Sequence, residues 1–155
     1  MTHATYADVL RPRAWRLGWV YDLTLVAGGS FLVALSAQAA FRLPFSPVPI
    51  TGQTLAVLLV GALLGSVRGA VSLLLYLAEG IAGLPVFAAG GAGVAYFLGP
   101  TGGYLVGFVF AAALTGLLAE RGWDRRVGST LIAMLIGTVA IYAAGLAWLA
   151  VYVRA

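Results

Sequence analysis

The sequence predicts an all-α integral membrane protein, a bundle of five transmembrane helices whose N-terminus lies in the cytoplasm. Hydrophobic residues make up 62% of the 155 residues and charged residues 9%, against about 25% charged residues in ordinary soluble domains. Mean hydropathy is +1.01, and the charged residues leave apolar runs long enough to cross a bilayer. We therefore expect a cytoplasmic segment over residues 1–22 and a single transmembrane helical domain over residues 23–155, in the cell membrane.

Five charge-free runs set the expected helices. The runs cover residues 23–41, 43–67, 69–78, 80–119 and 127–153. The run from 80 to 119 is too long for one span and is interrupted by Pro85, Pro100 and seven glycines between Gly83 and Gly103. It therefore divides into a helix end, a loop and another helix. We expect helices at about residues 23–41, 51–67, 69–84, 101–119 and 128–153.

The arginines predict the orientation of the bundle. With the N-terminus inside, seven of the nine arginines lie on the cytoplasmic side, in agreement with the positive-inside rule. These seven are Arg11, Arg13, Arg16, Arg68, Arg121, Arg125 and Arg126, whereas Arg42 and Arg154 lie outside. A second interpretation treats the first segment as a signal peptide, with basic residues, an apolar stretch and a small-residue cleavage site at Ala37-Gln38-Ala39.

Residue types missing from the sequence exclude several classes of function. The chain contains no Cys and no Lys, and its single His3 lies in the polar N-terminal segment. Disulfides, thiol nucleophiles, cysteine metal sites and a P-loop lysine are excluded, so we expect no metal or cofactor, and another subunit would have to bind ATP. The arginines form small groups instead of one basic face, which argues against nucleic-acid binding. No nucleophile, base and orienting group occur together, so an enzyme is the weakest class.

Small residues recur at helical spacing in three places. The longest series occupies every fourth position along the predicted fourth helix, at Gly99, Gly103, Gly107, Ala111, Thr115 and Ala119. Gly61, Gly65 and Gly69 repeat the spacing between the second and third helices, and Ser30 with Ala34 gives a shorter version on the first. Such residues let helix backbones approach closely in lipid. We expect packing within the bundle, with docking onto a partner membrane protein as the alternative.

Two irregular segments at the external side form the candidate site. The first, from Leu43 to Thr54, holds three prolines that fix φ and lack an amide donor, so it should be a stiff lip for a small-molecule pocket. Gln53 offers a donor and an acceptor to a neutral ligand, and Thr51 adds a hydroxyl. The alternative is that Thr51 caps the second helix and Gln53 bonds a neighbouring helix.

The second irregular segment, from Gly83 to Gly103, combines glycines with aromatic side chains. Its candidate ligand-contacting residues are Phe87, Gly90, Gly91, Tyr96 and, directly after it, Tyr104. Glycines would let backbone amides approach a ligand, and the aromatic rings would supply flat apolar walls. The alternative is an ordinary turn between two spans.

Glu79 lies inside the third apolar segment, where an ionisable residue is a candidate intramembrane polar site. No cation stands at helical spacing from it. The alternative is that Gly80 and Gly83 place it near the external end, where it is hydrated or bonded to the loop. Glu120 and Asp124, with their neighbouring arginines, are expected in a solvated cytoplasmic loop.

Four segments in this order resemble the BioY family, the biotin-specific substrate-binding components (S components) of energy-coupling factor (ECF) transporters. They are Pro47-Val-Pro-Ile-Thr-Gly-Gln-Thr54, Leu75-Tyr-Leu-Ala-Glu-Gly-Ile-Ala-Gly-Leu-Pro-Val-Phe87, Gly99-Pro-Thr-Gly-Gly-Tyr104 and Leu118-Ala-Glu-Arg-Gly-Trp-Asp-Arg125, and the resemblance runs from about residue 22 to residue 153. It implies a protein that binds biotin from outside, in a pocket formed by the first loop, the loop after the third helix and the last helix.

The resemblance also implies partners and residue roles. The usual partners of such a component are a coupling membrane subunit and a pair of cytosolic ATPases, and the component itself lies in the lipid bilayer. Thr51 and Gln53 would suit the ureido ring of biotin. Phe87, Tyr96 or Tyr104 would suit its sulfur ring and aliphatic tail, and docking would use the small residues Ser30 and Ala34 on the first helix.

The C-terminus departs from the family pattern. Members resemble six-helix bundles with both termini inside, in which an external loop with Pro-Gly-Asp and a following Lys opens the sixth helix. This sequence stops at Arg154-Ala155, before such a segment. We expect a truncated biotin transporter, or one completed by a separate piece. The alternatives are a membrane scaffold without transport activity and an S component for another vitamin.

Overall fold

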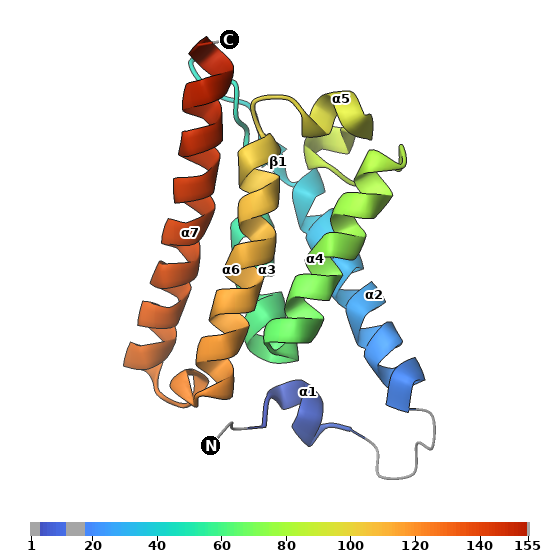
Figure 1. The fold of residues 1–155 in the computed structure, drawn as a ribbon, viewed down its shortest axis with the longest axis vertical. Coiled ribbons are helices and arrows are strands. Elements are labelled where there is room, and N and C mark those ends of the chain that lie inside the picture. Colours follow the sequence, from blue (N-terminus) through green and yellow to red (C-terminus); the bar gives the residue numbers. More distant parts are fainter. Residues whose placement is uncertain (1–3, 12–17, 155) are drawn as a thin grey trace.

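The computed structural model describes residues 4–11 and 18–154, and within them the chain forms a bundle of long helices (Figure 1). The long helices are α2 (Gly18–Gln38), α3 (Gln53–Leu64), α4 (Ser66–Ile81), α6 (Gly102–Glu120) and α7 (Val127–Arg154). The short elements are α1 (Tyr6–Val9), β1 (Ala40–Phe41), β2 (Ile50–Thr51), η1 (Ala88–Gly90), α5 (Gly93–Phe97) and η2 (Trp123–Arg125). His3, Arg13 and Arg16 lie outside the described residues.

Each of the five predicted helices is present as a helix, with shifted ends. α2 begins five residues before the predicted residue 23, because the charge of Asp22 is paired with Arg68 and does not end the helix. α3 stops at Leu64 because Gly65 adopts φ 89°, a conformation that favours glycine, and turns the chain directly into α4. In length and hydropathy α2, α6 and α7 are each sufficient to cross a membrane, and α3 is a shorter apolar helix.

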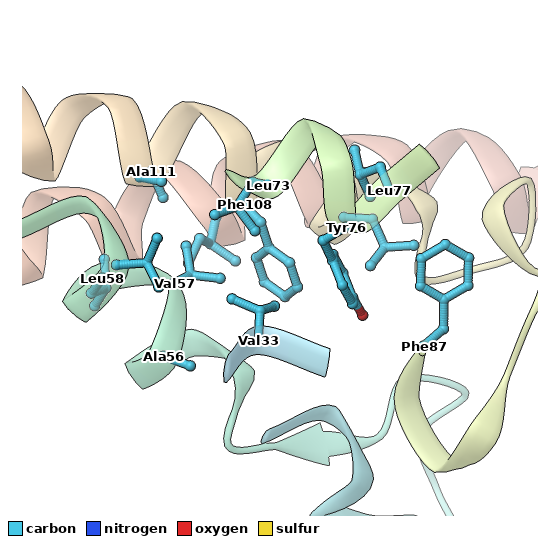
Figure 2. Close-up of a cluster of buried hydrophobic side chains, with 14 residues drawn as sticks. Val33, Ala56, Val57, Leu58, Leu73, Tyr76, Leu77, Phe87, Phe108 and Ala111 are labelled. Carbon is cyan, nitrogen blue, oxygen red and sulfur yellow. The ribbon is translucent and has the colours of Figure 1, made fainter. Parts of the chain in front are cut away.

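The two irregular segments lie at the same end of the bundle, as predicted. Figure 1 shows the β1–β2 hairpin and α5 at the end where α7 finishes, and α1 at the opposite end beneath the α3–α4 turn. α6 is the central helix, since it packs against α7, α3 and α4, while α2 packs mainly against α4. The core between these helices contains Val33, Val57, Leu73, Tyr76 and Phe108 (Figure 2).

Glycines bring α3, α4 and α6 into backbone contact. A methyl group at Gly61 would overlap the carbonyl oxygen of Ala112 on α6, and one at Gly69 would lie 3.0 Å from the Cα of Gly61. A methyl group at Gly116 would overlap the backbone at Gly65. These small residues therefore pack within the bundle, as expected, because the absence of a side chain lets the helix backbones meet.

Two other glycines of α6 let α7 pack closely against it. A methyl group at Gly103 would overlap the Cβ of Trp148, and one at Gly107 would lie 3.1 Å from the Cα of Ile141. The Trp148 indole also donates a hydrogen bond to the carbonyl of Gly99, at 3.0 Å. This bond ties the second irregular segment to α7.

Charged side chains link the helices at the end of the bundle that carries α1. Arg68 on α4 pairs with Asp8 of α1 at 2.7 Å and with Asp22 of α2 at 2.9 Å. Partial burial opposes the charge of Asp8, but hydrogen bonds from Arg68 and Thr5 outweigh it and lower the pKa of that carboxyl. Glu120 was expected in a solvated loop, which is wrong: its carboxylate accepts hydrogen bonds from the backbone N–H and hydroxyl of Ser66, at 2.7 and 2.9 Å.

Gly61→Ala should lower the free energy of unfolding by about 1–3 kcal/mol, because the added methyl group pushes α3 away from α6. Gly28→Ala is the matched control, since Gly28 is also helical and has nothing within 4 Å of the added methyl group. Reversible unfolding of both variants in detergent would measure the difference. Equal stability of the two variants would contradict the backbone contact.

Candidate functional site

A cavity of about 210 Å³ lies at the end of the bundle that carries both irregular segments. Its walls come from three parts of the chain: the first loop with the start of α3, the second segment with the start of α6, and the middle of α7. They comprise Leu43, Ser46, Val48, Pro49, Ile50, Thr51, Gln53 and Thr54, then Ala88, Tyr96, Thr101, Tyr104, Leu105 and Phe108, then Ile141 and Tyr142. The lining is mainly apolar with a few polar groups, as is usual for small-molecule sites.

The first loop is held rigidly at its base. β1 and β2 pair antiparallel, with Ala40 opposite Thr51 and Phe41 opposite Ile50. Inside the loop the backbone N–H of Ser46 bonds the carbonyl of Leu43 at 3.3 Å, and the Ser46 hydroxyl donates to the carbonyl of Val48 at 3.1 Å. Together with the three prolines, these bonds fix the lip of the cavity.

A chain of polar contacts lies at the start of α3. The Thr51 hydroxyl accepts the backbone N–H of Gln53 at 3.3 Å and donates to the Gln53 Oε1 at 3.1 Å. The Gln53 Nε2 then donates to the hydroxyl of Tyr76 on α4, at 2.6 Å. Gln53 therefore bonds a neighbouring helix, as the alternative expects, whereas Gly52 and not Thr51 stands at the N-cap of α3. Both residues also line the cavity, so a ligand role stays a prediction.

Tyr76 was not singled out in the sequence. Its side chain is fully buried, and its hydroxyl is the partner that fixes the orientation of the Gln53 amide. Each end of the Gln53 amide makes one of these bonds, which leaves one N–H and one lone pair of the amide outside this chain of contacts. The sequence does show a polar phenol inside an apolar run at this position. It does not show the partner of that phenol, because the contact depends on the packing of α4 against α3.

Aromatic rings connect this polar chain to the second irregular segment. Phe87 contacts Tyr76 edge-on, with ring centroids 5.6 Å apart, and stacks on Tyr96 with centroids 5.2 Å apart. Figure 2 shows the Phe87 ring beside Tyr76. Phe87 is fully buried and lies outside the cavity lining, so it supports Tyr96 from behind instead of facing the cavity. A side chain at Gly80 would overlap the Phe87 ring.

The glycines of the second segment shape the loop and do not line the cavity. Gly90 adopts φ 76°, and its backbone N–H bonds the carbonyl of Phe87 at 3.1 Å. A side chain at Gly91 would overlap the Tyr96 ring, and the carbonyl of Gly91 accepts the Phe87 N–H at 3.0 Å. We expected the backbones of Gly90 and Gly91 to approach a ligand closely. In the structure they instead contact Phe87 and Tyr96 and hold these two side chains in place.

Two aromatic side chains remain as walls. Tyr96 and Tyr104 both line the cavity, in the positions expected of apolar walls. Burial raises the pKa of Tyr96, against the lowering effects of Thr101 and Arg42, so the hydroxyl remains neutral. The Tyr104 ring meets Tyr142 of α7 edge-on, with centroids 5.9 Å apart.

Glu79 and Ser30 form a contact that the sequence did not reveal. The Ser30 hydroxyl donates to the Glu79 Oε2 at 2.6 Å, which joins α2 to α4. Glu79 therefore bonds a neighbouring helix, not the loop. Ser30 is 1% exposed and Ala34 packs against the core, so the face expected to dock a partner points into the bundle in this arrangement.

The fold defines an α-helical integral membrane protein with a cavity of small-molecule size at one end. The sequence pattern of the BioY family matches residues 5–155, and the chain belongs to that family. It is 42% identical over 137 residues to the biotin transporter BioY of Rhizobium etli, a match that covers 83% of this chain and 73% of that protein.

Other comparisons agree with the family. The biotin transporter BioY of Rhodobacter capsulatus is 46% identical over 121 residues, which cover 76% of this chain and 62% of that protein. A crystal structure of the S-component for biotin from an ECF-type ABC transporter matches with a TM-score of 0.80 and 30% identity, covering 90% of this chain and 77% of that chain. The chain thus spans less than two thirds of the length of the Rhodobacter relative.

Tyr76→Phe should lower the free energy of unfolding by about 1–3 kcal/mol, because the buried Gln53 amide loses its acceptor. Tyr142→Phe removes a cavity-lining hydroxyl that makes no hydrogen bond to the described residues, and is the matched control. Detergent unfolding would compare the two. A Tyr76→Phe protein as stable as the control would show that the Gln53 amide does not depend on this partner.

Proposed function

We propose that this chain is the biotin-capturing S component of an ECF transporter, and that it binds biotin in the cavity between the two irregular segments. The observation that carries the proposal is the placement of Gln53, Thr51, Tyr96 and Tyr104 around one cavity at the end of the bundle away from α1. Membership of a family whose relatives are named biotin transporters supports biotin as the ligand and argues against an enzyme.

The chemistry of the cavity suits biotin. The ureido ring of biotin offers two N–H donors and one carbonyl acceptor, and the remaining donor and lone pair of Gln53 can meet them, with the Thr51 hydroxyl beside it. The sulfur ring and aliphatic tail would lie against Tyr96 and Tyr104. Phe87, Gly90 and Gly91 serve the same site indirectly, because they fix the position of Tyr96.

We infer that the five long helices form one transmembrane domain over residues 23–155, and that residues 1–22, which include the first residues of α2, lie in the cytoplasm. Arg68, near the start of α4, and the group Arg121, Arg125 and Arg126, between α6 and α7, lie at the α1 end, whereas Arg42 follows β1 and Arg154 ends α7 at the other end. The positive-inside rule then assigns the cavity to the external side of the cell membrane. From there the protein can capture a vitamin from the medium.

The energy for transport comes from partners. The resemblance to ECF S components implies that ATP is hydrolysed by a pair of cytosolic ATPases coupled through a second membrane subunit, and the absence of a P-loop lysine from this sequence agrees with that. The likeness to an S-component of an ECF-type ABC transporter supports this division of labour. The chain itself contributes substrate capture within the lipid bilayer.

Labelled biotin should bind saturably to the purified chain in detergent and be displaced by excess unlabelled biotin but not by other vitamins. Gln53→Ala and Thr51→Val should each weaken binding by about 1–3 kcal/mol, a loss of about 5- to 150-fold in affinity. Thr24→Val is the matched control, because Thr24 is an exposed residue outside the cavity lining and its hydroxyl bonds the carbonyl of Val20 in its own helix.

Unfolding temperatures of the same samples would separate lost ligand contacts from lost structure. A folded chain that binds no biotin would contradict the proposed function and favour a scaffold, and binding of a different vitamin would replace biotin as the substrate. Unchanged biotin affinity in both site variants would remove Gln53 and Thr51 from the site.

A further inference from the structure

A second cavity, of about 510 Å³, lies against the first on its outer side. The two share six lining residues: Leu43, Ser46, Pro49, Ala88, Tyr96 and Thr101. Because the same side chains border both, the inner and outer cavities form one elongated site. Its inner part holds the Gln53 amide, and its outer part is bordered by Arg42 and by Tyr152 near the end of α7.

Arg42 is held at this position by the β-hairpin. Phe41 pairs with Ile50 across the hairpin, so the next residues outward, Arg42 and Pro49, lie at the base of the first loop, and both line the outer cavity. Arg42 is the one charged residue among the described residues that line either cavity. The elongated site therefore has a neutral polar end and a cationic end.

The charge of Arg42 has no counterion within the described part of the chain. The two ion pairs found there are both made by Arg68, at the opposite end of the bundle. The field of Arg42 nevertheless reaches the cavity, since it acts on the hydroxyl of Tyr96. A cation that borders a mainly apolar cavity without a carboxylate partner is a complement for an anionic group on the ligand.

We propose that Arg42 binds the carboxylate of an elongated monocarboxylic acid whose neutral polar head lies at Gln53, and that it selects the acid over neutral derivatives. This proposal rests on the proposed function, because biotin is such an acid, with its ureido ring and its carboxylate at opposite ends. A guanidinium suits the task because its fixed N–H groups match the two carboxylate oxygens.

The test compares biotin with biotin amide, in which a neutral carboxamide replaces the carboxylate, on the purified full chain in detergent. The wild type should bind biotin about tenfold more tightly than the amide, as expected of a charge-assisted hydrogen bond at an exposed site. Arg42→Gln should abolish this preference by weakening biotin alone, and Arg42→Lys should keep part of it. Added salt should reduce the wild-type preference.

Arg154→Gln is the matched control, because Arg154 is the other arginine at this end and does not line either cavity. It should leave the preference unchanged. The proposal is overturned if Arg42→Gln retains the preference for the acid, if it weakens both ligands equally, or if the loss occurs in Arg154→Gln instead. A wild type that binds both ligands equally also overturns it while leaving the proposed function standing, whereas a folded wild type that binds neither contradicts the proposed function itself.

Discussion

The backbone contact of α6 with α3 and α4 is the constraint on which the other features depend. In lipid, apolar side chains gain little by leaving their surroundings, so helices associate through close packing and interhelical hydrogen bonds. Gly61, Gly69 and Gly116 supply that packing by letting three helices meet at their main chains. Since α6 also carries α7 on its other side, this contact sets the positions of all the helices that surround the cavity.

A series of side-chain contacts connects this helix packing to the walls of the cavity. Packing of α3 against α4 brings the Gln53 amide to the Tyr76 hydroxyl, and the Tyr76 ring supports Phe87, which in turn supports Tyr96. The cavity is therefore bounded by groups that are already held in place before a ligand arrives. Such preorganisation lowers the entropy lost on binding, which suits a protein that captures a dilute solute.

Much of the fold was predictable because charge spacing and glycine interruptions limit where an apolar helix can begin and end. The start of α2 was misplaced because Asp22 counts as a charge in the sequence but is neutralised by Arg68 in space. The site was predicted in part: Thr51, Gln53, Tyr96 and Tyr104 border the cavity, whereas Phe87, Gly90 and Gly91 do not. The spacing of residues along one segment does not reveal which side of it faces the cavity. The hydrogen bonds of Ser30 and Tyr76 could not be predicted either, because they join segments that are distant in the sequence.

The brevity of α3 bears on how the protein enters its membrane. Its 12 residues extend about 18 Å at 1.5 Å per residue, well short of the roughly 30 Å hydrocarbon core. A translocation channel that admits helices one at a time would find no complete span in α3. The tight turn at Gly65 joins it directly to α4, so we expect the two helices to enter the lipid together as one hairpin. The residue that ends one helix and begins the next thus also sets the unit of insertion.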